Sequence, residues 1–360
     1  MELGGAEMSL LGLLESLDYS RTEVDLFVYS HRGELMKWIP KQVNLLPEMS
    51  EYKQIERPIK DVLKDGCFRI ALARMRAKRK FRRYLRKNHP KDGTAIFSYV
   101  ARELSPILPD INPGKEYDIA VSYLMPHDYV LRKVRAREKV AWIHTDYSSI
   151  DVDAALELPV WAGYDRIASI SPMVTDNFLK VFPPLGDKVF LKPNSVPVGL
   201  IRKRAMEIPE AEVSDEMPKV EGRINLLSVG RFSLAKNFDN VPDICRRLRE
   251  GGVDVCWYLV GFGCEEALIR NKITESGMDG FVRILGKKTN PYPYIRACDL
   301  YVQPSRYEGD PVTVKEALAL GKQVIVTDFA SAADLPVSVR RVPMDNAGCA
   351  GQMINILKCF

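Results

Sequence analysis

Two glutamates, Glu308 and Glu316, stand eight positions apart in the segment SRYEGDPVTVKEALALG and are the clearest candidates for chemistry. Their segment predicts a strand end, a turn and then a helix from about Val312 to Leu320. Such a turn directs backbone N–H groups and a helix N-terminus toward a ligand above the sheet, which favours phosphate. Carboxylates beside it would accept hydrogen bonds from sugar hydroxyls.

Two cations, Arg231 and Lys236, follow the apolar run INLLSVG in the segment VGRFSLAKN. A loop at the carboxyl end of a strand would bring them to the same edge of the sheet as the glutamates. Arginine grips a diphosphate with two hydrogen bonds, and lysine adds a mobile point charge. An exposed loop with two solvated cations is the alternative that spacing by itself leaves open.

The elements that would position these residues alternate between short apolar runs and longer helical stretches. From Asp25 onward the apolar runs are VDLFVYS, YDIAVSYL, VAWIHTD, RIASIS and KVFLKPN, and the rhythm restarts at INLLSVG. This alternation predicts parallel βαβ units, and so an α/β fold with doubly wound sheets. Helices of the second set end at Gly252, Gly277 and Gly321, because glycine tolerates the left-handed conformation.

A length of 360 residues suits two domains, each with its own core. We expect the linker after Asn194, in the extended stretch KPNSVPVG, and assign residues 1–196 and 197–360 to the two domains. No apolar run precedes the glycine pair and the expected helix Glu7–Leu17. In a doubly wound sheet the first strand lies in the middle, so the N-terminal domain is expected to lack it, with roughly ten to fifteen residues missing upstream. A natural five-strand variant is the alternative.

The composition, with 46% hydrophobic and 28% charged residues, excludes collagen-like, disordered and disulfide-scaffold classes. Seven scattered cysteines without a C-x-x-C pair predict reduced thiols in the cytoplasm. We expect neither a secretory signal nor a membrane span, because the chain has no apolar run of about 18 residues. No Asp or His cluster has metal-ligand spacing, so we expect no metal ion and no other cofactor.

The formal charge of +5 hides one basic segment, Arg69–Lys91, with eleven Lys and Arg and no acid. Its apolar residues at helical spacing are Ile70, Ala73, Ala77, Phe81 and Tyr84. A basic amphipathic helix suits an anionic membrane surface, with contacts from Arg79, Arg82, Arg83 and Arg86. The alternative is a helix that packs this stripe on the domain core. Nucleic acid is not expected as a partner, because its recognition motifs are missing.

The segment Ile224–Asp334 resembles glycosyltransferase family 4, also called group 1, whose members are retaining enzymes of the GT-B fold. The likeness is to the type that assembles bacterial polysaccharides. The family signature is an E-x7-E pair, which Glu308 and Glu316 match. The other matching positions are Gly309, Pro311, Ala317, Leu318, Gly321 and Asp328.

The resemblance implies two Rossmann-like domains that face each other across a cleft. It also implies transfer of a sugar, with retained configuration, from a nucleotide diphosphate sugar to a hydroxyl of a glycan or lipid-linked glycan. UDP is expected rather than GDP, and the protein would work in the cytoplasm or on the inner face of the plasma membrane. Two alternatives remain: a GT-B-fold epimerase or phosphorylase, and a non-catalytic subunit that binds nucleotide sugar or docks on membranes.

The resemblance also implies a role for individual residues. The donor diphosphate would be bound by Arg231, Lys236, Gly4, Gly5 and the amides of Val312, Thr313 and Val314. The donor sugar would contact His144, Glu308, Gly309, Asp310 and Pro311, with His144 and Glu308 as the catalytic residues. Glu316 would bind the ribose, and Gly286, Lys287 and Lys288 the base. Without the resemblance, His144 would be a satisfied polar residue at a strand end. Asp310 and Phe262 depart from the family pattern.

Overall fold

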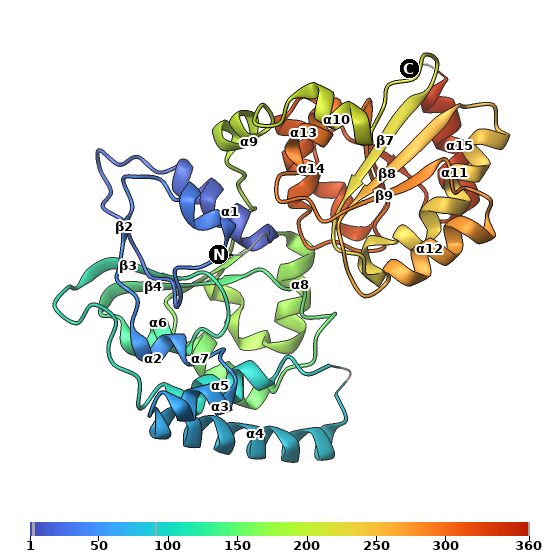
Figure 1. Ribbon diagram of the computed structural model, residues 1–360. Helices are drawn as coiled ribbons and strands as arrows, with labels where there is room; N and C mark the ends of the chain where they lie inside the picture. The colour runs from blue at the N-terminus through green and yellow to red at the C-terminus, as the bar shows by residue number, and fades with distance from the viewer. Residues whose placement is uncertain (2–3, 91, 359–360) are drawn as a thin grey trace. The chain divides into compact units, whose positions relative to one another are not determined.

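The computed structural model describes residues 1, 4–90 and 92–358, which form two compact units, Met1–Asn194 and Ser195–Phe360 (Figure 1). The division falls between Asn194 and Ser195, close to the expected boundary after residue 196. Lys91, the last residue of the expected basic segment, lies outside the described residues. Each unit is built around its own parallel sheet.

The sheet of the second unit has six parallel strands in the order β12-β11-β10-β7-β8-β9. The strands are β7 (Ile224–Val229), β8 (Val255–Val260), β9 (Val282–Gly286), β10 (Leu300–Gln303), β11 (Val324–Thr327) and β12 (Arg340–Val342). The inner strands β7, β8, β10 and β11 are almost entirely buried, because helices cover both faces of a parallel sheet. The winding reverses between β7 and β10, which are hydrogen-bonded neighbours, so the predicted doubly wound topology is confirmed.

Helices cover both faces of this sheet, as Figure 1 shows. One group is α11 (Val241–Glu250), α12 (Glu266–Glu275) and α15 (Asn346–Leu357), which share a buried core with β7 and β8. The other group is α9 (Val198–Arg204), α13 (Tyr292–Ala297) and α14 (Val312–Ala319), while α10 (Glu210–Glu216) packs on α13. The predicted glycine stops are confirmed, because Gly252, Gly277 and Gly321 all have positive φ, between 68° and 84°.

The first unit has four parallel strands in the order β3-β4-β5-β6 and a separate parallel pair, β1-β2. The strands are β1 (Asp25–Leu26), β2 (Asn44–Leu45), β3 (Tyr117–Ser122), β4 (Ala136–Ile143), β5 (Arg166–Ser169) and β6 (Val189–Leu191). The expected strand VDLFVYS is therefore much shorter, because its ladder is only as long as its short partner β2. Within the described residues no strand precedes α1 (Gly5–Glu15), which begins two residues before the expected helix.

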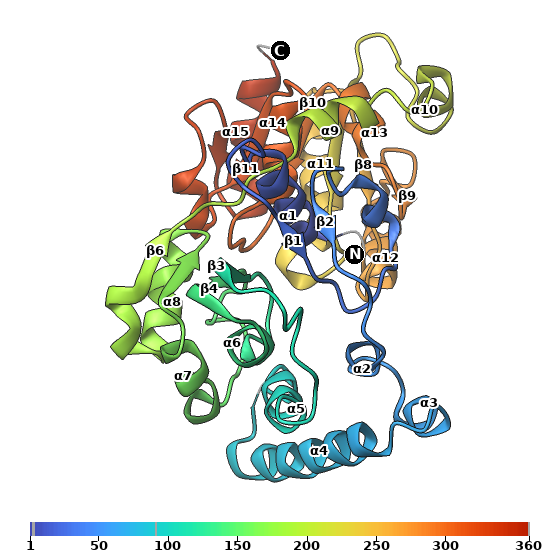
Figure 2. The same cartoon turned by 90° about the vertical axis from the view of Figure 1, so that its left-hand side faces the viewer.

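The helices of the first unit cover its sheet in layers, and α4 forms the outermost one (Figure 2). After α1 they are α2 (Ser50–Lys53), α3 (Ile59–Lys64), α4 (Phe68–Asn88), α5 (Ile96–Leu104), α6 (Asp128–Lys133), α7 (Ala154–Ala162) and α8 (Pro172–Val181). α4 packs along α5 with Ile70, Ala73 and Ala77 buried. The apolar stripe predicted from the sequence thus faces the domain core, which was the alternative to a membrane-facing stripe.

Candidate functional site

The loops that follow β7 and β10 are joined at the point where the winding of the second sheet reverses. Arg306 donates two hydrogen bonds of 2.8 Å to the carboxylate of Asp239, one from each terminal nitrogen. Its backbone N–H donates to the carbonyl oxygen of Ala235 at 2.8 Å. A paired guanidinium and carboxylate fix geometry as well as charge. The cationic loop and the glutamate loop are therefore held as one surface at the carboxyl ends of two neighbouring strands.

Glu308 is held through a single oxygen on this surface. Its Oε1 accepts hydrogen bonds from Lys236 Nζ at 2.6 Å, Ser305 Oγ at 2.6 Å and Gln303 Nε2 at 3.0 Å. The side chain is 11% exposed. Oε2 accepts no hydrogen bond from any described residue, so that atom is the one left for a ligand hydroxyl.

Gln303 is a site residue that the sequence analysis missed. It ends β10, is fully buried, and donates to both Ser305 and Glu308. Its Oε1 accepts from Tyr301 Oη at 2.8 Å and from Thr313 Oγ1 at 3.2 Å. The amide thus links the strand to the first turn of α14 and to the glutamate. A polar residue that closes an apolar strand, LYVQ, was the available signal.

Glu316 lies on α14 and is buried. Burial raises the pKa of its carboxyl to about 7, while Tyr292 and Arg204 act in the opposite direction. Tyr292 Oη donates to Glu316 Oε1 at 2.9 Å, and Arg204 Nη2 donates to the carbonyl oxygen of Thr289 at 2.7 Å. The positions of Tyr292 and Arg204 beside Glu316 were not predicted, because nothing in their spacing links α9 or α13 to α14.

The N-terminus of α14 lies between Glu308 and Glu316. Val312 and Thr313 open the helix, where amides have no intrahelical acceptor, whereas the amide of Val314 donates to Pro311 O at 3.1 Å. Asp310 accepts from Lys315 Nζ at 2.6 Å. This ion pair compensates the extra negative charge that departs from the family pattern, so Asp310 does not face the predicted phosphate site as an isolated anion.

The loops after β7 and β8 touch through glycines. A Cβ on Gly261 would lie 1.8 Å from the carbonyl oxygen of Gly230, and one on Gly263 would lie 2.2 Å from that of Phe232. Only glycine permits this approach of backbone to backbone. Arg231, between the two contact points, is exposed and forms no hydrogen bond or ion pair with the described residues. Its guanidinium is therefore available to a ligand.

The predicted base-binding segment follows β9. Gly286 has φ 74°, Lys288 forms a 2.6 Å ion pair with Glu216, and Lys287 Nζ lies 5.2 Å from the centre of the Phe262 ring. Both lysine side chains are thus engaged with protein groups. The backbone of the segment carries the remaining polar atoms.

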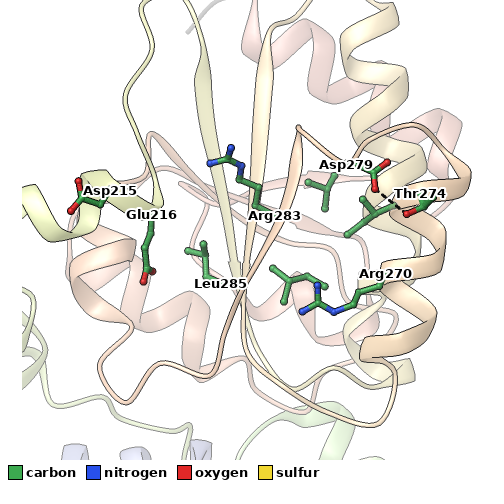
Figure 3. A pocket seen from close by; sticks show the side chains of 10 residues that line it. Asp215, Glu216, Arg270, Thr274, Asp279, Arg283 and Leu285 are labelled. Atoms are coloured by element: carbon green, nitrogen blue, oxygen red, sulfur yellow. Dashed lines mark hydrogen bonds between the residues drawn. The ribbon is translucent and has the colours of Figure 1, made fainter.

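A groove of about 550 Å³ lies elsewhere in the second unit, between α10, α12 and the edge strand β9 (Figure 3). Its charged lining residues are Asp215, Glu216, Arg270, Asp279 and Arg283. None of the residues predicted to bind the donor lines it. The groove is therefore distinct from the surface built around Glu308.

The predicted site residues of the first unit gather near α1. Gly4 caps that helix and Gly5 is its first residue. Tyr123 Oη donates to Ser9 Oγ of α1 at 2.7 Å, and its ring centre lies 4.5 Å from that of His144. Burial lowers the pKa of His144 to about 4, so its imidazole is neutral at pH 7. His144 Nε2 is buried and has no hydrogen-bond partner among the described residues.

The described part of the chain lacks two kinds of feature. No group of three or more His, Cys, Asp or Glu residues there is arranged to hold a metal ion. No helix there is long and apolar enough to cross a membrane.

Part of the chain is similar to known glycosyltransferases. Residues 210–336 match the family model of glycosyl transferases group 1. EpsF of Bacillus subtilis (strain 168), named as a glycosyltransferase, is 28% identical over 146 residues, which cover 39% of this chain and 36% of EpsF. The amylovoran biosynthesis glycosyltransferase AmsK of Erwinia amylovora is 26% identical over 120 residues, 31% of this chain and 30% of AmsK. The chain thus spans about a third of the length of these curated relatives.

Solved structures resemble the whole chain. The Anabaena protein HepE, crystallised with UDP and glucose, has a TM-score of 0.63 at 14% identity, over 98% of this chain and 86% of HepE. The trehalose-6-phosphate synthase OtsA has a TM-score of 0.62 at 15% identity, over 99% and 88% of the two chains. The fold is therefore the predicted GT-B fold of two Rossmann-like units. Within it, residues 210–336 match the model of group 1 glycosyltransferases, in agreement with the resemblance seen in the sequence.

Proposed function

We propose that the protein is a retaining glycosyltransferase that moves a sugar from a nucleotide diphosphate sugar to a hydroxyl of a glycan or lipid-linked glycan. The observation that carries this proposal is the contact of Lys236 with Glu308 where the second sheet reverses its winding. Ligands of doubly wound sheets bind at such a point. A cation, a carboxylate and a helix N-terminus at one place suit the diphosphate and the hydroxyls of a sugar nucleotide.

The donor would be bound by groups with different roles. Arg231, which is exposed, and Lys236 neutralise the diphosphate together with the first amides of α14. Glu316 accepts from the ribose hydroxyls, and the backbone of residues 286–288 meets the base. UDP is our preferred nucleotide, with support from the presence of UDP in the structure of HepE. The cations and the helix N-terminus supply the charge, so we propose no metal ion.

The mechanism would follow from how Glu308 is held. Three donors fix its Oε1, so the carboxylate positions the donor sugar rather than removing a proton. The acceptor hydroxyl would attack on the face that the diphosphate leaves, and the leaving phosphate would take the proton. His144, whose imidazole is neutral, is proposed as a second residue that contacts the donor sugar.

The acceptor is proposed to be lipid-linked and to be met in the cytoplasm, at the inner face of the plasma membrane. A Campylobacter jejuni relative, 31% identical over 108 residues, which cover 30% of this chain and 29% of that relative, is named as a galactosaminyltransferase acting on an undecaprenol diphosphate. The basic helix α4 supports the same location through its charge. Polysaccharide assembly, as of a capsule or exopolysaccharide, is the process in which such a reaction belongs.

Calorimetry with UDP- and GDP-sugars, followed by an assay for released or transferred sugar, tests the proposal. We expect UDP-sugar binding that weakens at least about tenfold in Arg231→Ala and Glu316→Ala. Arg270→Ala, an exposed arginine on α12, is the matched control and should bind normally. Unchanged binding in both site variants would refute the assignment of the site. Binding with neither hydrolysis nor transfer would favour a non-catalytic subunit, and donor isomerisation an epimerase.

A further inference from the structure

The basic helix α4 has a second apolar stripe, on the side opposite its packed face. Phe68, Leu72 and Met75 are 66%, 46% and 45% exposed. They stand four and three residues apart, so they lie on one face of the helix, in its first two turns. Ile70, Ala73 and Ala77 occupy the opposite face and are buried against α5. The exposed stripe is therefore not part of the core of the first unit.

The same outer face continues into a row of arginines. At 100° per residue, Arg79, Arg82, Arg83 and Arg86 fall within about 60° of the direction set by Phe68. All four are exposed. The face is thus apolar at its N-terminal end and cationic at its C-terminal end, and extends over roughly 27 Å. We call it the outer face of α4; Figure 2 shows α4 at the periphery of the first unit.

The charge of this face is not compensated by neighbouring acids. α4 contains no Asp or Glu. Two of the cations of α4 interact with other groups of the first unit. Arg74 donates to the backbone carbonyls of Gln54 and Arg57, and Lys80 forms an ion pair with Glu103. None of the four outer arginines forms an ion pair with a described residue. Such an arrangement attracts an anionic surface over a large area.

We propose that the outer face of α4 docks on an anionic lipid bilayer, with Phe68, Leu72 and Met75 inserted at the level of the head groups. The four arginines then contact lipid phosphates in the plane of the membrane. The combination of apolar and cationic side chains favours a lipid bilayer as the partner. Three large apolar side chains exposed to water suit the apolar interior of a bilayer, and the adjoining cations suit its charged head groups. An acidic protein or a nucleic acid would use the arginines but leave the apolar trio in water.

This proposal differs from the sequence-based one in the side chains that meet the lipid. The stripe from Ile70 to Tyr84 belongs to the core, and the insertion is assigned to Phe68, Leu72 and Met75. The surface belongs to the first unit, while Lys236, Glu308 and Glu316 belong to the second. Loss of membrane binding and loss of donor binding are therefore separate outcomes.

The test is sedimentation of the full chain with vesicles of neutral phosphatidylcholine, alone or mixed with phosphatidylglycerol, at low and high salt. We expect at least tenfold stronger binding to the anionic vesicles. Reversal of Arg79, Arg82, Arg83 and Arg86 to Glu should abolish binding. The matched control reverses four exposed cations elsewhere in the first unit, Arg21, Lys41, Lys180 and Lys192, and should retain it.

A second variant separates insertion from electrostatic attraction. Changing Phe68, Leu72 and Met75 together to Ser should leave binding at low salt but remove it at high salt, because only attraction between charges is screened. Circular dichroism and UDP binding confirm that each variant is folded. Equal binding of the wild type to neutral and anionic vesicles, or full binding by the arginine variant, would overturn the proposal. Binding of the wild type to RNA or an acidic polypeptide but to neither vesicle would do the same.

Discussion

Lys236 Nζ lies 2.6 Å from Glu308 Oε1, and this ion pair joins the loop after β7 to the loop after β10. Both side chains are mostly buried, at 19% and 11% exposure. The lysine that we assign to the diphosphate is thus paired with the carboxylate that we assign to the sugar. Each member of the pair orients the other.

Removing the lysine charge tests its assigned role. Lys236→Met should weaken UDP binding by about 10- to 100-fold, because a hydrogen bond to a charged group contributes about 1.5–3 kcal/mol. Calorimetric titration with UDP measures the change. Lys272→Met on α12 is the control, since Lys272 is exposed and pairs only with Glu275 among the described residues.

Neutralising the glutamate should have a different effect. Glu308→Gln leaves Lys236 without its anionic partner, so UDP binding should be kept or strengthened while sugar transfer falls. The amide can still accept from Gln303 and Ser305, which preserves the packing of the loop. A loss of UDP affinity equal to that of Lys236→Met would contradict separate roles for the two residues.

Glu316 should make the stability of the free protein depend on pH. Its pKa is raised in the folded state to about 7 from 4.5. The folded state therefore favours the protonated form, and this contribution is fully present below about pH 4.5 and is lost as the pH rises through about 7. A shift of this size corresponds to roughly 3 kcal/mol. Urea unfolding at pH 5 and pH 8 should show that the wild type loses free energy of unfolding at the higher pH and that Glu316→Gln loses less. Equal losses in the two proteins would contradict the assignment of the pH dependence to Glu316.

The glycine contact between the loops after β7 and β8 predicts a large effect of one methyl group. Gly261→Ala would place Cβ 1.8 Å from the backbone carbonyl oxygen of Gly230. That oxygen cannot move away without displacing the loop after β7. We expect a loss of at least about 3 kcal/mol in the free energy of unfolding. Gly351→Ala on α15 is the control, because its Cβ meets no atom within 4 Å and should stabilise by about 0.5–1 kcal/mol. Thermal unfolding compares the two variants.

His144 is predicted to act as a neutral group. Because burial lowers its pKa to about 4, the pH profile of sugar transfer should show no inflection near 6.5 from this residue. His144→Ala should reduce transfer by about 100-fold and leave UDP affinity unchanged, because it removes one polar group from the reacting sugar. His89→Asn, at an exposed position with φ 45° that asparagine tolerates, should transfer normally. Loss of UDP affinity in His144→Ala would contradict a role confined to the sugar.

Much of the second unit could be predicted from its residues. The helix expected from Val312 to Leu320 is Val312–Ala319, and the loops with Arg231 and Glu308 do follow strands. These features are local, because they depend on apolar spacing and on glycines that stop helices. The strands of the first unit were harder to predict. β1 is only Asp25–Leu26, because the length of a strand depends on a partner strand that is distant in sequence.

The site was predicted in outline and completed by tertiary contacts. Gln303, Tyr292 and Arg204 were missed. Gln303 and Tyr292 donate hydrogen bonds to Glu308 and Glu316, and Arg204 acts on Glu316 through its charge. The spacing of residues along the chain does not show which elements will pack together. The compensation of Asp310 by Lys315 likewise depends on how the first turn of α14 is built. The sequence shows which polar side chains are present, but not which partners orient them in the folded protein.

The sequence predicted the alternation of strands and helices, the glycine stops and the positions of the charged groups at strand ends. It did so because each depends on neighbours along the chain. The packing of the folded chain determines that one oxygen of Glu308 is engaged and the other open. It also determines that α4 buries the stripe with Ile70 and exposes the one with Phe68. Periodicity along the chain defines the faces of a helix, whereas the burial of each face depends on which elements pack against it.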